Sequence, residues 1–506
     1  MDLTDERPPR TSHHRSVHAA LRNAPLAAGL VACAVLVVRS LIESMTGQAL
    51  NLVSGVWLAL AWDTKQGIFY RDLSDSGAYG GTRYFPLTFL LAGAYMRAGL
   101  GPVGAGQFTG LTSIVILAGG VFRFLKALGS PGRYAALAAI LALSAYFVQH
   151  TIFAVRSEPL AAAFVMWGAT GVARRLGGSD DRTWAASAAA AFALAMAAKP
   201  TAMYGAIAAV LALVSARRTS DALWLLVMCV VLWISVLLAM HLWSGGTALR
   251  SIRACALAGA SITDVVAPQN LAASLLRLSS SRVLSVVLIA SLIAVFVARA
   301  WTTLPGWLLG GALATSALTL STAGTILTNQ AVEPYVAASA CLIWVLSRRP
   351  FAPTGALLLT GLLLWTSAQN VRELRWVLRT APWASVAQRT ATTAATERCR
   401  DPWLAESPLL PVLSDRRPLL LDPFAFRVAA QNNPELAKDL IDRLVRREFW
   451  CVVLEHDPET DAGREWYRNV HLGEPVIEAV RSHYRFAQSI EGHRFYIPFN
   501  SRTAGP

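Results

Sequence analysis

The amino-acid sequence predicts a polytopic α-helical membrane protein with a small soluble α/β domain at its C-terminal end. Three observations predict this fold class. Of the 506 residues, 54% are hydrophobic and only 15% are charged. The apolar residues form repeated blocks, each close to the about 20 residues that a helix needs to cross hydrocarbon. Beyond residue 370, charged residues become frequent, long apolar runs stop, and strand-like runs alternate with helix-like ones.

About eleven apolar spans follow one another along the chain. Because backbone groups in hydrocarbon must be hydrogen-bonded within their own segment, we expect each span to be a helix. The spans cover residues 24–42, 105–125, 134–152, 158–173, 183–197, 202–216, 222–240, 283–298, 305–322, 332–347 and 354–370. The chain is thereby divided into a basic tail at 1–23, a membrane domain at 24–370 and a C-terminal domain at 371–506.

The first external loop, at about 43–104, contains two shorter apolar stretches. They cover residues 51–62 and 86–98. We expect both to be interfacial helices, because counting the second as a span would reverse the side of every later loop.

The distribution of basic residues predicts the orientation. The formal net charge is +14, and the arginines gather in the N-terminal tail and in alternate short loops, as the positive-inside rule describes. We therefore expect a multi-pass protein of a bacterial inner (plasma) membrane, with no nucleic acid as partner. Its N-terminus would be cytoplasmic and its C-terminal domain extracytoplasmic. Cys399 and Cys451 of that domain can pair in an oxidising compartment, and the sequence leaves open whether they do.

Ionisable residues near membrane spans are costly to bury and usually serve a function. The first external loop concentrates six such residues, Asp63, Lys65, Arg71, Asp72, Asp75 and Arg83, and Tyr84 lies next to Arg83. Its carboxylates suit the deprotonation of a hydroxyl or the binding of a divalent metal. An arginine beside a tyrosine suits the binding of a phosphate at the level of the lipid headgroups. The same charges can also serve only to hold the loop together.

Three further polar clusters fall on the predicted external side. Arg156 and Glu158 lie between the third and fourth spans, Lys199 lies between the fifth and sixth, and Asn329 and Glu333 flank the start of the tenth. Glu158 suits the role of an acid or base, and Arg156 and Lys199 suit contacts to an anionic headgroup. Each cluster also has a structural alternative. Arg156 and Glu158 can form a local ion pair, and Lys199 can extend to the membrane interface. Asn329 and Glu333 can cap a helix.

The order of these motifs resembles the GT-C superfamily of membrane glycosyltransferases, which includes protein O-mannosyltransferases, the lipid A aminoarabinose transferase and family 39-like bacterial enzymes. The similar stretches are G-I-F-Y-R-D (67–72), R-Y-F-P-L (83–87), R-S-E-P-L (156–160), K-P-T (199–201) and G-x-x-x-x-N-x-x-x-E (324–333). Each is degenerate, but in order they cover most of residues 25–370. The resemblance implies transfer of a sugar from a polyprenyl-phosphate donor to a lipid, glycan or protein acceptor on the external face, usually with inversion.

The resemblance also implies roles for the candidate residues. An acid of the first external loop acts as the base, and basic residues stabilise the departing lipid phosphate. Many members carry an acid at the start of the first interfacial helix, where residues 52–55 of this chain read L-V-S-G. We therefore expect the catalytic acid to be Asp72, Asp75, Asp63 or Glu158. The expected substrate-binding residues are Arg71, Arg83, Tyr84, Arg156, Lys199, Asn329 and Glu333. The sequence indicates no required cofactor. A divalent metal is compatible with it, but the sequence does not identify which residues would bind the metal.

Two other functions are compatible with the sequence. A flippase or transporter of lipid-linked glycans is expected to show polar residues deep within several spans or an internal repeat. The polar residues lie mainly at the external ends of the spans, and we find no repeat. A non-catalytic assembly subunit that uses its tail as a binding module becomes the better interpretation if the acids of the first loop are dispensable.

Overall fold

The structure is a computed structural model that describes residues 12–75, 77–179, 183–322, 327–348 and 353–499. Residues 1–11 of the predicted basic tail lie outside the described residues. The described chain consists mainly of helices, with a small sheet near its C-terminal end. The structure thus confirms the predicted class, in which a helical membrane domain precedes a small α/β region.

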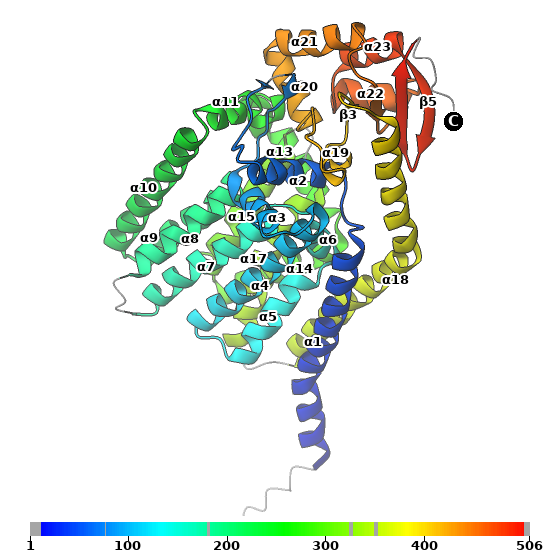
Figure 1. The fold of residues 1–506 in the computed structure, drawn as a ribbon. Coiled ribbons are helices and arrows are strands. Elements are labelled where there is room, and N and C mark those ends of the chain that lie inside the picture. Colours follow the sequence, from blue (N-terminus) through cyan, green and yellow to red (C-terminus); the bar gives the residue numbers. More distant parts are fainter. Residues whose placement is uncertain (1–11, 76, 180–182, 323–326, 349–352, 500–506) are drawn as a thin grey trace, which may run out of the picture.

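Apolar helices form a bundle that makes up most of the molecule (Figure 1). They are α1 (Ser12–Thr46), α4 (Pro102–Ala127), α5 (Gly132–Ser144), α6 (Tyr146–Phe153), α7 (Glu158–Leu176), α8 (Trp184–Ala198), α9 (Tyr204–Ser215), α10 (Thr219–Trp243), α14 (Arg282–Ala298), α15 (Leu304–Leu320), α17 (Val332–Arg348) and α18 (Pro353–Arg398). Side chains on the outer faces of α10 and α14 are apolar and exposed, for example Trp224 and Phe296. An apolar outer surface is expected of helices that face lipid.

The number of membrane-spanning helices can be compared with the predicted eleven. By length and composition, four helices of the described chain can each cross a membrane, or six if two bent pairs each count as one span. One pair is α5 with α6, bent by 69°, and the other is α13 (Pro268–Ser279) with α14, bent by 105°. Several remaining helices are apolar but shorter than a full crossing. The predicted count of eleven is therefore not confirmed.

Two helices of the first external loop lie at the end of the bundle below the C-terminal region (Figure 1). They are α2 (Leu52–Lys65) and α3 (Pro86–Arg97), at the places where the sequence predicts interfacial helices. Asn51 begins α2, and its side-chain oxygen accepts hydrogen bonds from the amides of Val53 and Ser54. Gly55 lets α19 (Leu409–Leu413) approach α2 closely, because a Cβ atom there would lie 2.6 Å from the amide nitrogen of Leu409.

The C-terminal region contains a four-stranded sheet in the order β3-β4-β6-β5. Its strands are β3 (Leu404–Ala405), β4 (Val452–Leu454), β5 (Tyr484–Ile490) and β6 (His493–Pro498), and only β3 and β4 run parallel. The accompanying helices are α20 (Pro423–Asn432), α21 (Pro434–Val445), α22 (Asp461–Asn469) and α23 (Glu474–His483). Helix α18 continues unbroken past residue 370 to the sheet (Figure 1), so the predicted boundary lies inside this helix and stays a prediction.

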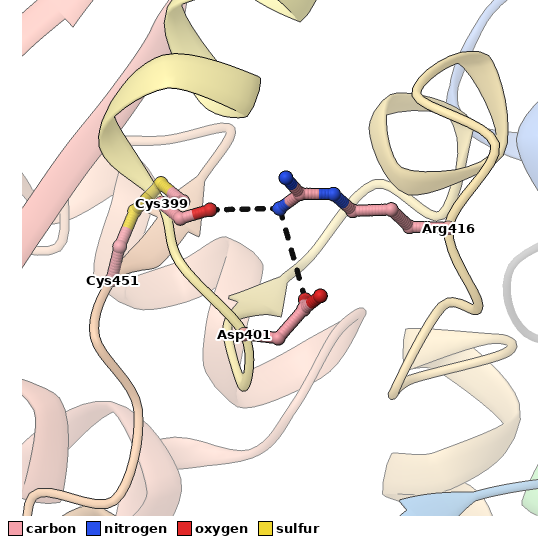
Figure 2. The surroundings of a disulfide bond; sticks show 4 residues. All are labelled: Cys399, Asp401, Arg416 and Cys451. Carbon is pink, nitrogen blue, oxygen red and sulfur yellow. Dashed lines mark hydrogen bonds and ion pairs between the residues drawn. A yellow bond between two sulfur atoms is a disulfide. The ribbon is translucent and has the colours of Figure 1, made fainter.

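Two contacts hold the C-terminal region in place, one to the first loop and one to the end of α18. Tyr79, in the short strand β2 (Ala78–Tyr79), donates its amide to Leu419 O at 2.6 Å and accepts the amide of Leu421 at 3.0 Å, which joins the first external loop to this region. Cys399 at the end of α18 forms a disulfide with Cys451 beside β4 (Figure 2). The pairing that the sequence left open is thus present in the structure.

Candidate active site

Asp63 and Arg71 form a buried ion pair. Arg71 donates from Nη2 and Nε to the two carboxylate oxygens of Asp63, each at 2.7 Å, and both side chains are almost wholly excluded from solvent. Arg71 also donates from Nη1 to Pro418 O at 2.5 Å. Both oxygens of Asp63 are therefore occupied, and the pair fastens the first external loop to the C-terminal region.

Asp72 and Asp75 lie nearer the surface. Asp72 Oδ1 pairs with Arg250 Nη2 at 2.9 Å, and the two side chains are 54% and 63% exposed. Asp75 Oδ2 pairs with Arg417 Nη2 at 2.5 Å. The structure does not gather the three acids of the first loop into one group, and a catalytic role for them stays a prediction.

Arg156 is a buried cation with hydrogen-bond donors left unused by the described residues. It lies between α6 and α7, is 4% exposed, and donates from Nη2 to Asn51 Oδ1 at 2.7 Å. Its Nε and Nη1 have no hydrogen-bond partner among the residues that the structure describes. Burial lowers the pKa of the Arg156 guanidinium, and the nearby Tyr84 and Glu158 oppose this shift. A buried guanidinium with unused donors is costly unless an anion binds it, and phosphate oxygens match its planar geometry.

Lys199 brings three of the sequence-predicted residues together. Its Nζ lies 3.7 Å from Glu158 Oε1, at the start of α7, and 3.3 Å from Glu333 Oε1, in α17. The same ammonium donates to Gln330 Oε1 at 2.9 Å. Asn329 lies one residue earlier in α16 (Leu327–Gln330), where it is half-buried. The cluster thus uses the neighbouring amide, Gln330, which the sequence analysis did not select.

Tyr84 lies where the two clusters and the C-terminal region meet. Burial raises the pKa of the Tyr84 phenol, and four charged residues act on it: Arg83, Asp422, Arg156 and Glu158. Arg83 also lies over the Phe424 ring of α20, with its Cζ atom 4.6 Å from the ring centroid. The structure therefore groups Arg83, Tyr84, Arg156, Glu158, Lys199 and Glu333 of the predicted site residues, with Asn329 next to the group. It places Asp63, Arg71, Asp72 and Asp75 in ion pairs outside it.

Three residues of this site escaped the sequence analysis: Asn51, Gln330 and Asp422. Asn51 and Asp422 begin helices, and the available signal was the preference of Asn and Asp for that position, which predicts a cap and not a ligand contact. For Gln330 we find no local signal, since its role depends on the position of Lys199.

Comparison with known proteins identifies the fold. No protein-family model matches the sequence, and no curated protein matches it. Among solved structures, ArnT from Cupriavidus metallidurans bound to undecaprenyl phosphate superposes with a TM-score of 0.59 over 94% of this chain and 99% of that chain, at 12% identity. The archaeal oligosaccharyltransferase AglB from Archaeoglobus fulgidus, in complex with an inhibitory peptide and a dolichol-phosphate, gives a TM-score of 0.52 over 94% and 75%, at 14% identity.

Both proteins are GT-C superfamily glycosyltransferases. This chain has the GT-C fold. At such low identity the likeness concerns the fold alone, and it confirms the resemblance that the order of the sequence motifs suggested. It also agrees with a polytopic membrane protein, as the apolar helices require.

A divalent metal is compatible with this fold. AglB from Archaeoglobus fulgidus has also been solved in complex with Zn and sulfate, and that structure superposes with a TM-score of 0.50 over 92% of this chain and 74% of that chain, at 12% identity. Within the described part of this chain, no group of three or more His, Cys, Asp or Glu residues could hold a metal ion.

Proposed function

We propose that the chain is a GT-C glycosyltransferase that moves a sugar from a polyprenyl-phosphate donor to a lipid, glycan or protein acceptor, with inversion. The observation that carries the proposal is Arg156, a buried guanidinium whose Nε and Nη1 lack partners within the described residues. The ArnT and AglB structures hold undecaprenyl phosphate and dolichol-phosphate, which supports a lipid phosphate as the ligand of the matching fold here.

In this proposal Arg156 binds the phosphate of the donor. The acceptor attacks the anomeric carbon of the sugar, the bond between that carbon and the phosphate oxygen breaks, and the lipid phosphate leaves with the electron pair. Negative charge grows on the phosphate as the bond breaks, and a fixed cation in a dry site stabilises that charge strongly. The barrier falls because Arg156 is already in place and does not have to reorient.

Lys199 supplies a second cation to the donor site. Its ammonium is held between Glu158 and Glu333, at 3.7 and 3.3 Å, so its position is determined from two helices. We propose that Glu158 positions Lys199 and limits the net positive charge next to Arg156. Without these carboxylates, burial of the Lys199 ammonium would be costly before the donor binds.

We propose that the reaction takes place on the external face of the plasma membrane. The disulfide between Cys399 and Cys451 supports this orientation, because disulfides persist mainly in oxidising compartments. The positive-inside distribution of arginines points the same way. In this orientation the N-terminus is cytoplasmic, and the C-terminal domain, from about residue 370, is extracytoplasmic.

A transfer assay with matched variants tests the proposal. Purified protein is incubated with a panel of radiolabelled polyprenyl-phosphate sugars and with membrane extracts as acceptor. We expect transfer by the wild type and by R464Q, which removes an exposed arginine of α22 that pairs with Asp461, and a loss of about 100-fold or more in R156Q. If the wild type binds a donor but transfers no sugar, the chain is not a transferase under these conditions. The flippase or transporter then becomes the better interpretation.

A further inference from the structure

Asp422 brings a carboxylate of the C-terminal region to Tyr84 and Arg83. It immediately precedes α20 and is 3% exposed. Its Oδ1 accepts hydrogen bonds from the amides of Phe424 and Ala425, at 3.0 and 3.1 Å. Its Oδ2 accepts no hydrogen bond from any residue that the structure describes. One oxygen is thus fixed by the backbone and the other is available.

The chain on either side of Asp422 is held against the first external loop. On one side, the backbone of Tyr79 pairs with residues 419–421. On the other side, Phe424 lies under the guanidinium of Arg83, with 4.6 Å between Arg83 Cζ and the ring centroid. Asp422 therefore keeps a defined position next to Arg83 and Tyr84 even though it belongs to a distant part of the sequence.

The other acids of the site are already engaged. Both oxygens of Asp63 accept from Arg71, and Glu158 and Glu333 share the ammonium of Lys199. At the start of the first interfacial helix, where many GT-C members carry an acid, the described chain has Asn51. Two acids act on Tyr84, Glu158 and Asp422. Glu158 is paired with Lys199, whereas no cation of the described residues lies within 4.0 Å of the Asp422 carboxylate.

We propose that Asp422 accepts the proton of the acceptor hydroxyl or amine. The inference rests on the proposed function and adds a catalytic residue from the C-terminal region. As the acceptor oxygen or nitrogen bonds to the anomeric carbon, its proton passes to Asp422 Oδ2, while the lipid phosphate leaves with the electrons of the broken bond. The Asp422 carboxyl then returns its proton to solvent, so no further reactant is needed.

A purely capping role does not require a charged residue at this position. Asn and Ser begin helices about as well as Asp, and they avoid the cost of a buried carboxylate. Burial raises the pKa of Asp422, opposed by the two capping amides and by the charges of Arg83 and His471. A carboxylate with a raised pKa is a better proton acceptor than an exposed one. The charged and titratable groups that interact with Asp422 are Arg83, His471, Tyr84 and the Cys255 thiol.

The test variant is D422N, because Asn preserves the helix cap. We expect D422N to unfold at the same or a higher temperature and to bind undecaprenyl phosphate as the wild type does. Its rate of sugar transfer should fall by about 10²- to 10⁴-fold, and the acidic limb of the pH profile of kcat/KM should disappear. The control is E474Q in the first turn of α23, an exposed glutamate paired with Arg468, which should transfer at the wild-type rate.

Azide separates a catalytic role from a structural one, because this nucleophile has no proton to lose. We expect D422N to form the glycosyl azide at the wild-type rate, and D422S, which also keeps a cap, to behave likewise. A wild-type rate of ordinary transfer in D422N, or an equal loss with azide, would overturn the inference. Transfer by the wild type and by D422N, but not by R156Q, would contradict the role of Asp422 and leave the proposed function intact. Absence of transfer by the wild type would contradict both the proposed function and the role of Asp422.

Discussion

Arg156 donates a hydrogen bond from Nη2 to Asn51 Oδ1 at 2.7 Å, and the same oxygen accepts the amides of Val53 and Ser54 at the start of α2. Because the Asn51 amide is neutral, this contact orients the guanidinium without cancelling its charge. An aspartate at this position would form an ion pair with Arg156 and compete with a phosphate. The choice of Asn over Asp therefore keeps the cation available to an anionic ligand.

The Asn51 contact predicts a simple experiment. N51D preserves the helix cap but places a carboxylate against Arg156, so we expect affinity for undecaprenyl phosphate to fall by about 10-fold, in keeping with the strength of one charge-assisted contact. N51S, which caps α2 without a charge, should bind nearly as tightly as the wild type. Equal or tighter binding by N51D would mean that Arg156 is not the phosphate ligand.

The Asp63–Arg71 pair predicts a large effect on stability. D63N leaves Arg71 buried without its counter-ion, and removal of one partner of a buried pair costs about 3–5 kcal/mol of unfolding free energy. D72N breaks the exposed pair with Arg250 and should cost at most about 1 kcal/mol. Thermal unfolding of both variants in detergent measures the difference, and similar unfolding temperatures would contradict the burial that the structure shows.

The disulfide predicts effects on both stability and labelling. C451S opens a cross-link between residues 52 positions apart and should lower the unfolding free energy by about 2–5 kcal/mol. Cys399 and Cys451 are buried, so in protein taken from cells and then unfolded they should react with a maleimide only after reduction. Labelling without reductant would show that the pair is not formed in the cell.

Glu406 predicts a pH-dependent contribution to stability. Burial by itself raises the pKa of the Glu406 carboxyl, but the hydrogen bond and charge of His471, with the Glu455 amide and the Trp466 indole, outweigh it and hold the pKa below its ordinary value. A lowered pKa in the folded state stabilises the protein above the unfolded pKa of about 4.3, and this stabilisation is lost as the pH falls through the folded pKa.

The test compares E406Q with the wild type across pH. At pH 7 we expect E406Q to lose about 1–3 kcal/mol of unfolding free energy, and the difference should narrow as the pH falls below about 4.3. E435Q, which alters an exposed glutamate of α21, should show no such trend. A difference between E406Q and wild type that is constant with pH would rule out the ionised carboxylate as the cause.

The sequence alone predicted the membrane class and a helix in each of the two apolar stretches of the first loop, and it selected Glu158, Lys199 and Glu333 from three separate clusters without predicting that they meet. The selection was possible because charged residues stand out in apolar sequence and are costly to leave unpaired in a bundle. Asn51 and Asp422 could not be recognised as site residues, because each lies near the site only through the packing of distant segments. The ion-pair partners of Asp72 and Asp75 could not be predicted either, since Arg250 and Arg417 come from distant segments of the chain.

The central claim is that Arg156 holds the phosphate of a lipid donor at the external face. The most direct measurement is a cryo-electron microscopy structure of the protein with undecaprenyl phosphate. The account predicts phosphate oxygens at about 3 Å from Arg156 Nε and Nη1, on the side of the C-terminal domain. A phosphate bound elsewhere, with these two nitrogens still without a partner, would contradict it.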